Sequence, residues 1–167
     1  MSSQVNNLSG ECPCVALARA LSAVMMALVT GLLLIPVLDQ ALKFFVLFRL
    51  GSRSVPLGRM GKLQVVQTQI WMARTPRSLN LMVLWTLWIL GACALIAVSS
   101  LAPSCGWFAG VLVGGSLSHG IESSSRGWIC DYVCLRFWPA FNIADVAITV
   151  GACGLAGRLI LMTKALG

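Results

Sequence analysis

The chain has 167 residues, of which 58% are hydrophobic and 10% charged, and its net charge is +7. Soluble domains carry about 25% charged residues, so this composition excludes an ordinary soluble fold. The apolar residues come in long blocks, which predict an all-α polytopic membrane protein. Because the Lys and Arg residues lie between these blocks, membrane phospholipids are the nearest anions, and we expect no nucleic-acid partner.

Residues 1–14 are polar and predict a disordered tail, and residues 15–167 predict a single membrane domain. Four apolar blocks in this domain are long enough to be membrane-spanning helices. They cover residues 15–38, 79–98, 105–121 and 141–162. Four spans place both termini on one side of the membrane. The third block is rich in glycine, which favours close packing of membrane helices.

The segment between the first two blocks predicts a small β-containing element. Residues 51–61 are rich in turn-forming residues, and residues 64–72 alternate as a short strand does. We expect Asp39 and Lys43 to close the first helix as a local ion pair. Residues 44–50 form an apolar patch that we then expect along the membrane interface.

Four of the five acidic residues fall where the predicted spans emerge at one face of the membrane: Asp39, Glu122, Asp131 and Asp145. A carboxylate inside an apolar helix is costly, so Asp145 is a candidate functional residue. Asp131 precedes the same helix. Two carboxylates at one membrane face suggest a pair that shares a proton and activates water, as in aspartic proteases.

Two motifs at these aspartates resemble the lipoprotein signal peptidase family, also called signal peptidase II. The Asp131-Tyr132 dipeptide resembles the family's V-D-[FY] segment, and P-A-F-N-I-A-D at residues 139–145 resembles its [PA]-x-F-N-x-A-D helix start. The D-Q-x-x-K pattern from Asp39 to Lys43 extends the resemblance into the N-terminal third. The family also places a small β-sheet over the active site, between the first two helices.

This resemblance implies an intramembrane aspartic endopeptidase that removes signal peptides from diacylglyceryl-modified prolipoproteins. It implies that Asp131 and Asp145 are catalytic and that no metal or other cofactor is needed. Five further residues would support the pair or position the substrate: Asp39, Lys43, His119, Glu122 and Asn142. The implied location is the bacterial inner membrane, with the site toward the periplasmic or outer face. Counting Lys and Arg in the loops favours the opposite orientation.

The chain departs from the family pattern at several positions. The family has G-G-A-x-G-N-x-x-D-R where this chain has residues 114–123, so His119, Glu122 and Ser123 replace Asn, Asp and Arg. The family's N-x-G-x-x-F motif is absent near residues 74–79. These departures leave open a catalytically inactive descendant that serves as a structural subunit of a membrane complex. A small channel or transporter with Asp145 as a proton relay is a third hypothesis.

The seven cysteines are an odd number, so at least one is unpaired within the chain. Cys130 and Cys134 flank Asp131, and a disulfide between them is one possibility if that face is oxidising. A zinc site that adds His119 and Asp131 is another, although the spacing is not that of a standard zinc finger.

Overall fold

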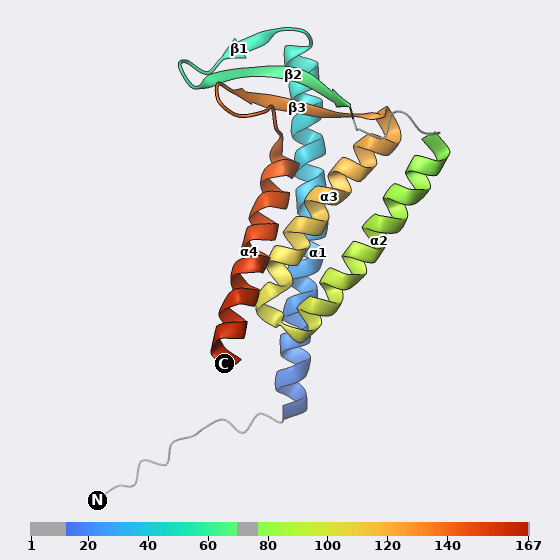
Figure 1. Ribbon diagram of the computed structural model, residues 1–167, viewed down its shortest axis with the longest axis vertical. Coiled ribbons are helices and arrows are strands. Elements are labelled where there is room, and N and C mark those ends of the chain that lie inside the picture. Colours follow the sequence, from blue (N-terminus) through green and yellow to red (C-terminus); the bar gives the residue numbers. More distant parts are fainter. Residues whose placement is uncertain (1–12, 70–76, 167) are drawn as a thin grey trace, which may run out of the picture.

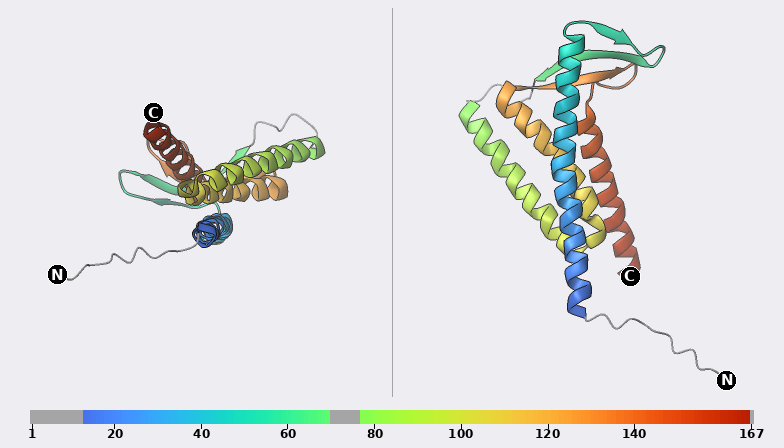
Figure 2. Two further views of the ribbon diagram at one scale, coloured as in Figure 1. Left: turned by 90° about the horizontal axis from the view of Figure 1, so that it is seen from below. Right: turned by 180° about the vertical axis from the view of Figure 1, so that it is seen from behind.

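The computed structural model describes residues 13–69 and 77–166. Four long helices form a bundle, and a three-stranded sheet lies across one end of it (Figures 1 and 2). The helices are α1 (Pro13–Leu50), α2 (Arg77–Leu101), α3 (Gly106–Arg126) and α4 (Ile143–Leu166), with a short 3-10 helix, η2 (Pro103–Cys105), before α3. The strands are β1 (Ser54–Pro56), β2 (Gly61–Gln69) and β3 (Trp128–Leu135). The predicted fold class is confirmed.

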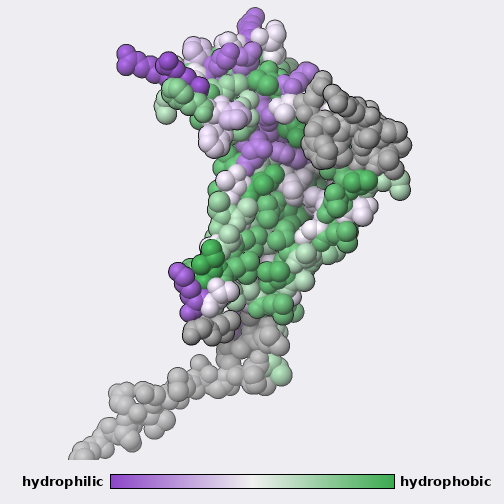
Figure 3. Space-filling model, in the orientation of Figure 1, coloured by the Kyte–Doolittle hydropathy of each residue, from purple (hydrophilic) through white to green (hydrophobic). Residues whose placement is uncertain are grey.

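Within the described residues, three helices are long and apolar enough to cross a membrane, over Leu21–Leu50, Leu81–Leu101 and Ile143–Ala165. Many of their apolar side chains are exposed, and they form a hydrophobic band across the face of the bundle that Figure 3 shows. The remaining helix, α3, packs against α1, α2 and α4. Because α3 is enclosed by the others, its polar side chains can point inward, as the buried Ser118 and Glu122 do. The start of α1 and the end of α4 lie at the end of the bundle opposite the sheet (Figure 1).

Helix α1 is longer than the sequence predicted. It continues through Pro36 to Leu50 without a break, so Asp39 and Lys43 lie inside the helix and do not close it. Both side chains are fully buried between helices and form an ion pair there. Residues 44–50, which the sequence predicted as an apolar patch along the membrane interface, continue α1 as a helix with Phe44, Phe45 and Phe48 exposed. The predicted N-terminal tail lies outside the described residues up to position 12, and the helix already begins at Pro13.

Glycines let the backbone of α3 contact the backbones of the neighbouring helices, as the sequence predicted. A Cβ atom placed on Gly114 would lie 2.4 Å from the carbonyl oxygen of Gly31 in α1. On the other side of α3, a Cβ on Gly115 would lie 2.8 Å from the carbonyl oxygen of Ala144 in α4. Small residues at these contacts let van der Waals packing and polar contacts hold the helices together. Gly115 thus sets the distance between α3 and the first turn of α4.

Strand β3 was not predicted, because its residues were interpreted as a loop before the last span. The sheet has the order β1-β2-β3 with antiparallel pairing. Leu63 of β2 pairs with Val133, but two positions earlier on β3 the partner of Asp131 is Val66 rather than Val65. This irregularity reverses which β2 side chains share a face with Asp131, since side chains alternate along a strand. It places Thr68 on the face of Asp131. The predicted strand over residues 64–72 agrees up to Gln69, and its remainder lies outside the described residues.

The chain folds back on itself between β3 and α4. Phe141 pairs with Val133: its N–H donates to the Val133 carbonyl (3.1 Å), and its carbonyl accepts from the Val133 N–H (3.0 Å). The same carbonyl accepts from the Tyr132 N–H at 3.2 Å. This pairing sets Asn142, the next residue, directly beside Asp131.

Substitution of Gly114 tests the close contact between α1 and α3. We expect Gly114→Ala to lower the free energy of unfolding by roughly 1–3 kcal/mol, because the added methyl group meets rigid backbone. Gly157→Ala in α4 is the matched control, since nothing lies within 4 Å of a Cβ there. Thermal unfolding in detergent measures both variants. Equal stability of the two would contradict the contact.

Candidate active site

Asp131 lies on β3 and is only 5% exposed. Its Oδ1 accepts a hydrogen bond from Asn142 Nδ2 (2.6 Å), and its Oδ2 accepts one from the Thr68 hydroxyl. Burial raises the pKa of the Asp131 carboxyl, and the nearby charge of Asp145 raises it further, while the hydrogen bonds from Thr68 and Asn142 oppose this shift. The net effect is upward, so the Asp131 carboxyl keeps its proton to a higher pH than a solvated aspartate does.

Asp145 lies in the first turn of α4, where it takes part in capping the helix. The Asn142 Oδ1 accepts a hydrogen bond from the Asp145 N–H (3.1 Å), and the Asp145 Oδ2 accepts one from the Asn142 N–H (2.9 Å). This reciprocal arrangement is a capping box, with Asn and Asp in the roles usually taken by Ser or Thr and Glu. The Asp145 side chain is 39% exposed, so the two aspartates lie in unlike surroundings.

Two distant side chains satisfy the remaining free N–H groups at the start of α4. The Tyr132 hydroxyl accepts from the Ile143 N–H at 3.3 Å, and the Asp39 Oδ1 accepts from the Ala144 N–H at 3.1 Å. A helix start leaves such donors without partners inside the helix. Here β3 and α1 supply the acceptors, which ties the start of α4 to both elements.

Asn142 links the two aspartates. It is 1% exposed, and its amide nitrogen donates to Asp131 and to the Cys130 carbonyl while its amide oxygen accepts from the Asp145 N–H. Across residues 13–69 and 77–166, no hydrogen bond joins the two carboxyl groups directly. The pair expected from the sequence is therefore bridged by an amide, which holds both carboxyl groups in fixed positions relative to each other.

His119 approaches this pair from α3. Its Nε2 lies 3.3 Å from the Asn142 Oδ1 and 3.5 Å from the Asp145 Oδ1, and its side chain is 19% exposed. The structure thus places His119 beside Asp145 and Asn142. A protonated imidazole would donate toward either oxygen from this position.

A buried charge network lies beneath the aspartates. Lys43 Nζ is 2.7 Å from the Asp39 Oδ2 and 2.6 Å from the Glu122 Oε2, and all three side chains are fully buried. Arg126 Nη1 pairs with the Glu122 Oε1 at 3.0 Å, and the Ser118 hydroxyl donates to the Asp39 Oδ2 at 2.6 Å. Removing one partner of a buried ion pair typically costs about 3–5 kcal/mol, because the other charge is left uncompensated. The network therefore fastens α1 to α3 close to the start of α4.

The structure brings all seven predicted site residues into one connected set of contacts. Two further residues, to which no sequence pattern assigned a role, contribute to the site: Thr68 contacts Asp131, and Tyr132 contacts the start of α4. The alternation of β2 placed Thr68 on one face of a strand, but the partner strand was unknown. Tyr132 adjoins Asp131 in the sequence, and its side chain points instead toward the helix start.

Cys130 and Cys134 are not bridged, and every cysteine in the described part of the chain is a free thiol. Four positions along a strand span about 13 Å, which is too far for a disulfide. Burial raises the pKa of Cys130 to about 11, which leaves the thiol protonated at neutral pH. No cluster of His, Cys, Asp or Glu within residues 13–69 and 77–166 has the arrangement of a metal site, which corrects the zinc alternative.

Comparison with known proteins places this arrangement among membrane peptidases. The family described as Signal peptidase (SPase) II matches residues 31–161. Lipoprotein signal peptidases from Moorella thermoacetica and Halothermothrix orenii are 39% and 40% identical over 51 and 43 residues, which are 30% and 26% of this chain. These stretches cover only 34% and 30% of the two relatives' lengths. The lipoprotein signal peptidase of Haemophilus ducreyi is 40% identical over 57 residues, 32% of this chain and 33% of that protein.

The whole fold also has solved counterparts. Two structures described as bacterial membrane enzymes superpose with a TM-score of 0.63 at 15% identity. One alignment covers 89% of this chain and 91% of the other, and the second covers 85% and 92%. At this identity the likeness establishes the fold. The family match spans most of the chain and includes both aspartates, the buried charge network and the sheet, and the chain therefore belongs to the signal peptidase II family.

Proposed function

We propose that this protein is an aspartic endopeptidase that removes the signal peptide from diacylglyceryl-modified prolipoproteins. The observation that carries the proposal is the pair Asp131 and Asp145. The two residues lie on either side of a single buried amide and have different surroundings. Acid–base hydrolysis requires one carboxyl group that is protonated and a second that can accept a proton. Two carboxyl groups in different environments meet this need. The curated relatives, which bear the name lipoprotein signal peptidase, supply the substrate class.

The two carboxyl groups take different roles in this proposal. Asp131, whose pKa is raised by burial, holds the proton and donates it toward the scissile carbonyl oxygen. Asp145 lies at the positive end of α4 and is 39% exposed, so it is the carboxylate that can reach an incoming water and accept its proton. During turnover the proton returns to Asp131 before the next cycle.

The position of the pair suits a substrate that lies in the membrane. The apolar span of α4 begins at Ile143, two residues before Asp145, and that of α1 ends at Leu50, close to the sheet. A signal-peptide helix packed along the hydrophobic band would bring its end to the level of the pair, with acyl chains still in the bilayer. We place the protein in the bacterial inner membrane with the site toward the periplasmic or outer face, as in the family.

The alternatives from the sequence have no observation in their favour. A structural subunit without activity has no reason to retain a costly buried acid, and here Asp131, Asn142 and Asp145 are all present and connected. In a proton relay through the membrane, Asp145 would need further titratable groups along α4. Within Ile143–Leu166 the remaining ionisable groups are Arg158, Lys164 and the thiol of Cys153, none of which relays protons readily at neutral pH.

Replacing each aspartate by asparagine tests the catalytic roles. We expect Asp131→Asn and Asp145→Asn each to lower cleavage of a diacylglyceryl-modified prolipoprotein by at least about 10³-fold, because neither amide can exchange the proton. Asp39→Asn should cost less, since Asp39 contacts the backbone of α4 and not the reacting groups. Processing by purified protein in lipid, followed by gel shift, measures all three.

The wild-type protein is the reference for this assay, and an active lipoprotein signal peptidase is the positive control. If the wild type does not process the substrate while that enzyme does, the proposed activity is wrong. If the wild type cleaves and both asparagine variants cleave equally well, the assignment of the pair is wrong and the activity stands.

The buried Asp131 also predicts a dependence of stability on pH. Because its pKa in the folded protein lies above the ordinary value of 3.8, its contribution to stability is complete below pH 3.8 and is lost as pH rises through the folded pKa. Asp131→Asn removes this loss, and its amide can still accept from Asn142 and donate to Thr68. We therefore expect the variant to gain thermal stability relative to wild type as pH rises from 4 to 8. Parallel melting curves across this range would contradict the assignment.

A further inference from the structure

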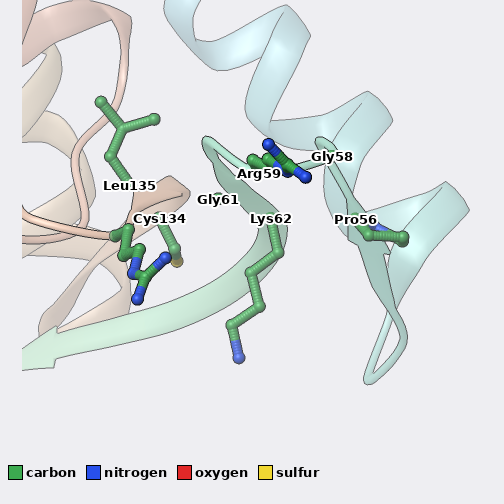
Figure 4. Close-up of a pocket in the computed structure, with 8 residues that line it drawn as sticks. Pro56, Gly58, Arg59, Gly61, Lys62, Cys134 and Leu135 are labelled. Carbon is green, nitrogen blue, oxygen red and sulfur yellow. The ribbon is translucent and has the colours of Figure 1, made fainter.

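A groove at the tip of the sheet is lined by basic side chains that make no contact with the candidate active site. Its volume is about 490 Å³, and it lies between the β1–β2 hairpin and the end of β3. Three basic residues line it, Arg59, Lys62 and Arg136 (Figure 4). An adjoining hollow of about 360 Å³ shares Arg59 and Arg136 and adds Phe137 and Trp138. The groove and the adjoining hollow together therefore combine positive charge with large aromatic side chains.

The acids of the described chain do not neutralise these cations. Asp39, Glu122, Asp131 and Asp145 are all engaged in the buried network and the candidate active site. Within residues 13–69 and 77–166, no ion pair involves Arg59, Lys62 or Arg136. The side chain of Arg136 stacks over the Phe137 ring, 5.3 Å from its centroid, which leaves its N–H groups available to an anion. The groove thus presents positive charge that lacks a counter-charge within the fold.

The groove lies at the depth where the membrane ends. The apolar span of α1 stops at Leu50, four residues before β1, and the span of α4 starts at Ile143, five residues after Trp138. Phe137 is 89% exposed and Trp138 is 66% exposed, which is costly in water and favourable among headgroups. A second pair of this kind, Arg49 over the exposed Phe45 at 5.6 Å, lies near the end of α1.

We propose that this groove binds the headgroup of an anionic phospholipid, with the phosphate held by Arg59, Lys62 and Arg136 and the glycerol backbone against Phe137 and Trp138. Guanidinium groups match phosphate oxygens with paired N–H donors. An acidic polypeptide would also meet the charge, but it would leave the two exposed aromatic rings unused. The site is separate from the aspartates, so the proposal does not depend on the peptidase activity.

Quenching of Trp138 fluorescence tests the site directly. The full-length protein is placed in phosphatidylcholine bilayers that contain a small fraction of phosphatidylglycerol or phosphatidylcholine brominated near the headgroup. Subtracting the signal of Trp138→Phe isolates the contribution of Trp138. We expect the brominated phosphatidylglycerol to quench Trp138 more strongly than brominated phosphatidylcholine at the same fraction. Equal quenching by the two lipids would overturn the proposal.

Matched charge variants show which cations are responsible. A cation near an anionic headgroup contributes about fivefold in affinity, so Arg59→Gln with Arg136→Gln should weaken the preference for phosphatidylglycerol by roughly tenfold or more. Replacing both by Lys should retain most of it. Arg158→Gln with Lys164→Gln removes the same charge at the far end of α4 and should leave the preference unchanged. All the replaced side chains are exposed, so we expect each variant to fold. An equal loss in the far-end variant would refute the site.

Competition distinguishes the lipid from other anions. Soluble glycerol phosphate at the same total phosphate concentration should not displace the lipid, because it lacks the membrane anchor. If it does displace it, the groove recognises free phosphate and the lipid proposal is wrong. If an acidic peptide removes the quenching at equal concentration, the groove binds a polypeptide and the proposal is likewise wrong.

Discussion

The need to satisfy four carboxylates at one end of an apolar bundle governs this structure. An isolated charge in such surroundings costs several kcal/mol even after relaxation. Lys43 meets part of this need by lying between Asp39 and Glu122 at 2.7 and 2.6 Å. This requires α1 to remain helical past Asp39, so that the lysine one turn later reaches α3. The length of α1 is therefore a consequence of the charge network, and so is the position of the sheet that follows it.

The start of α4 connects this network to the candidate active site. Asp39 accepts from the Ala144 N–H, and Asn142 and Asp145 cap each other. Asp145 is thus oriented by its own helix and by α1 at once, while Asn142 extends the arrangement to Asp131 on β3. Side chains that hold a reacting group in place are as necessary as the group itself. Three of the positions at which this chain departs from the family pattern border this scaffold: His119 contacts Asp145 and Asn142, Glu122 pairs with Lys43, and Ser123, next to Glu122 in the sequence, is buried.

The two ends of the sheet have different chemical character. One part of it carries Asp131 and Thr68, which hydrogen-bond to each other over the helix ends. The tip beyond carries the basic groove and its aromatic neighbours. Since β2 and β3 run from one to the other, the same two strands carry both the Asp131 carboxyl group and the basic groove. The structure also changes the count of loop charges: Lys43 and Arg49 belong to α1 and Lys62 belongs to β2, so these three are not charges of a free loop.

The sequence by itself determined the class of fold, the approximate positions of the four long helices, the convergence of the acids on one face and the family. These follow from local features, namely the length of apolar blocks, the parity of spans and short motifs around Asp131 and Asp145. Tertiary structure decided what depends on partners far along the chain. Strand β3 exists because β2 pairs with it between residues 59 to 74 positions apart, and the irregularity in that pairing brings Thr68 to Asp131. The continuation of α1 past Asp39 depended on Glu122, 79 positions away from Lys43. A local sequence pattern cannot predict such contacts. Whether a charged residue ends a helix or lies buried within it depends on whether a side chain from a distant part of the chain pairs with it.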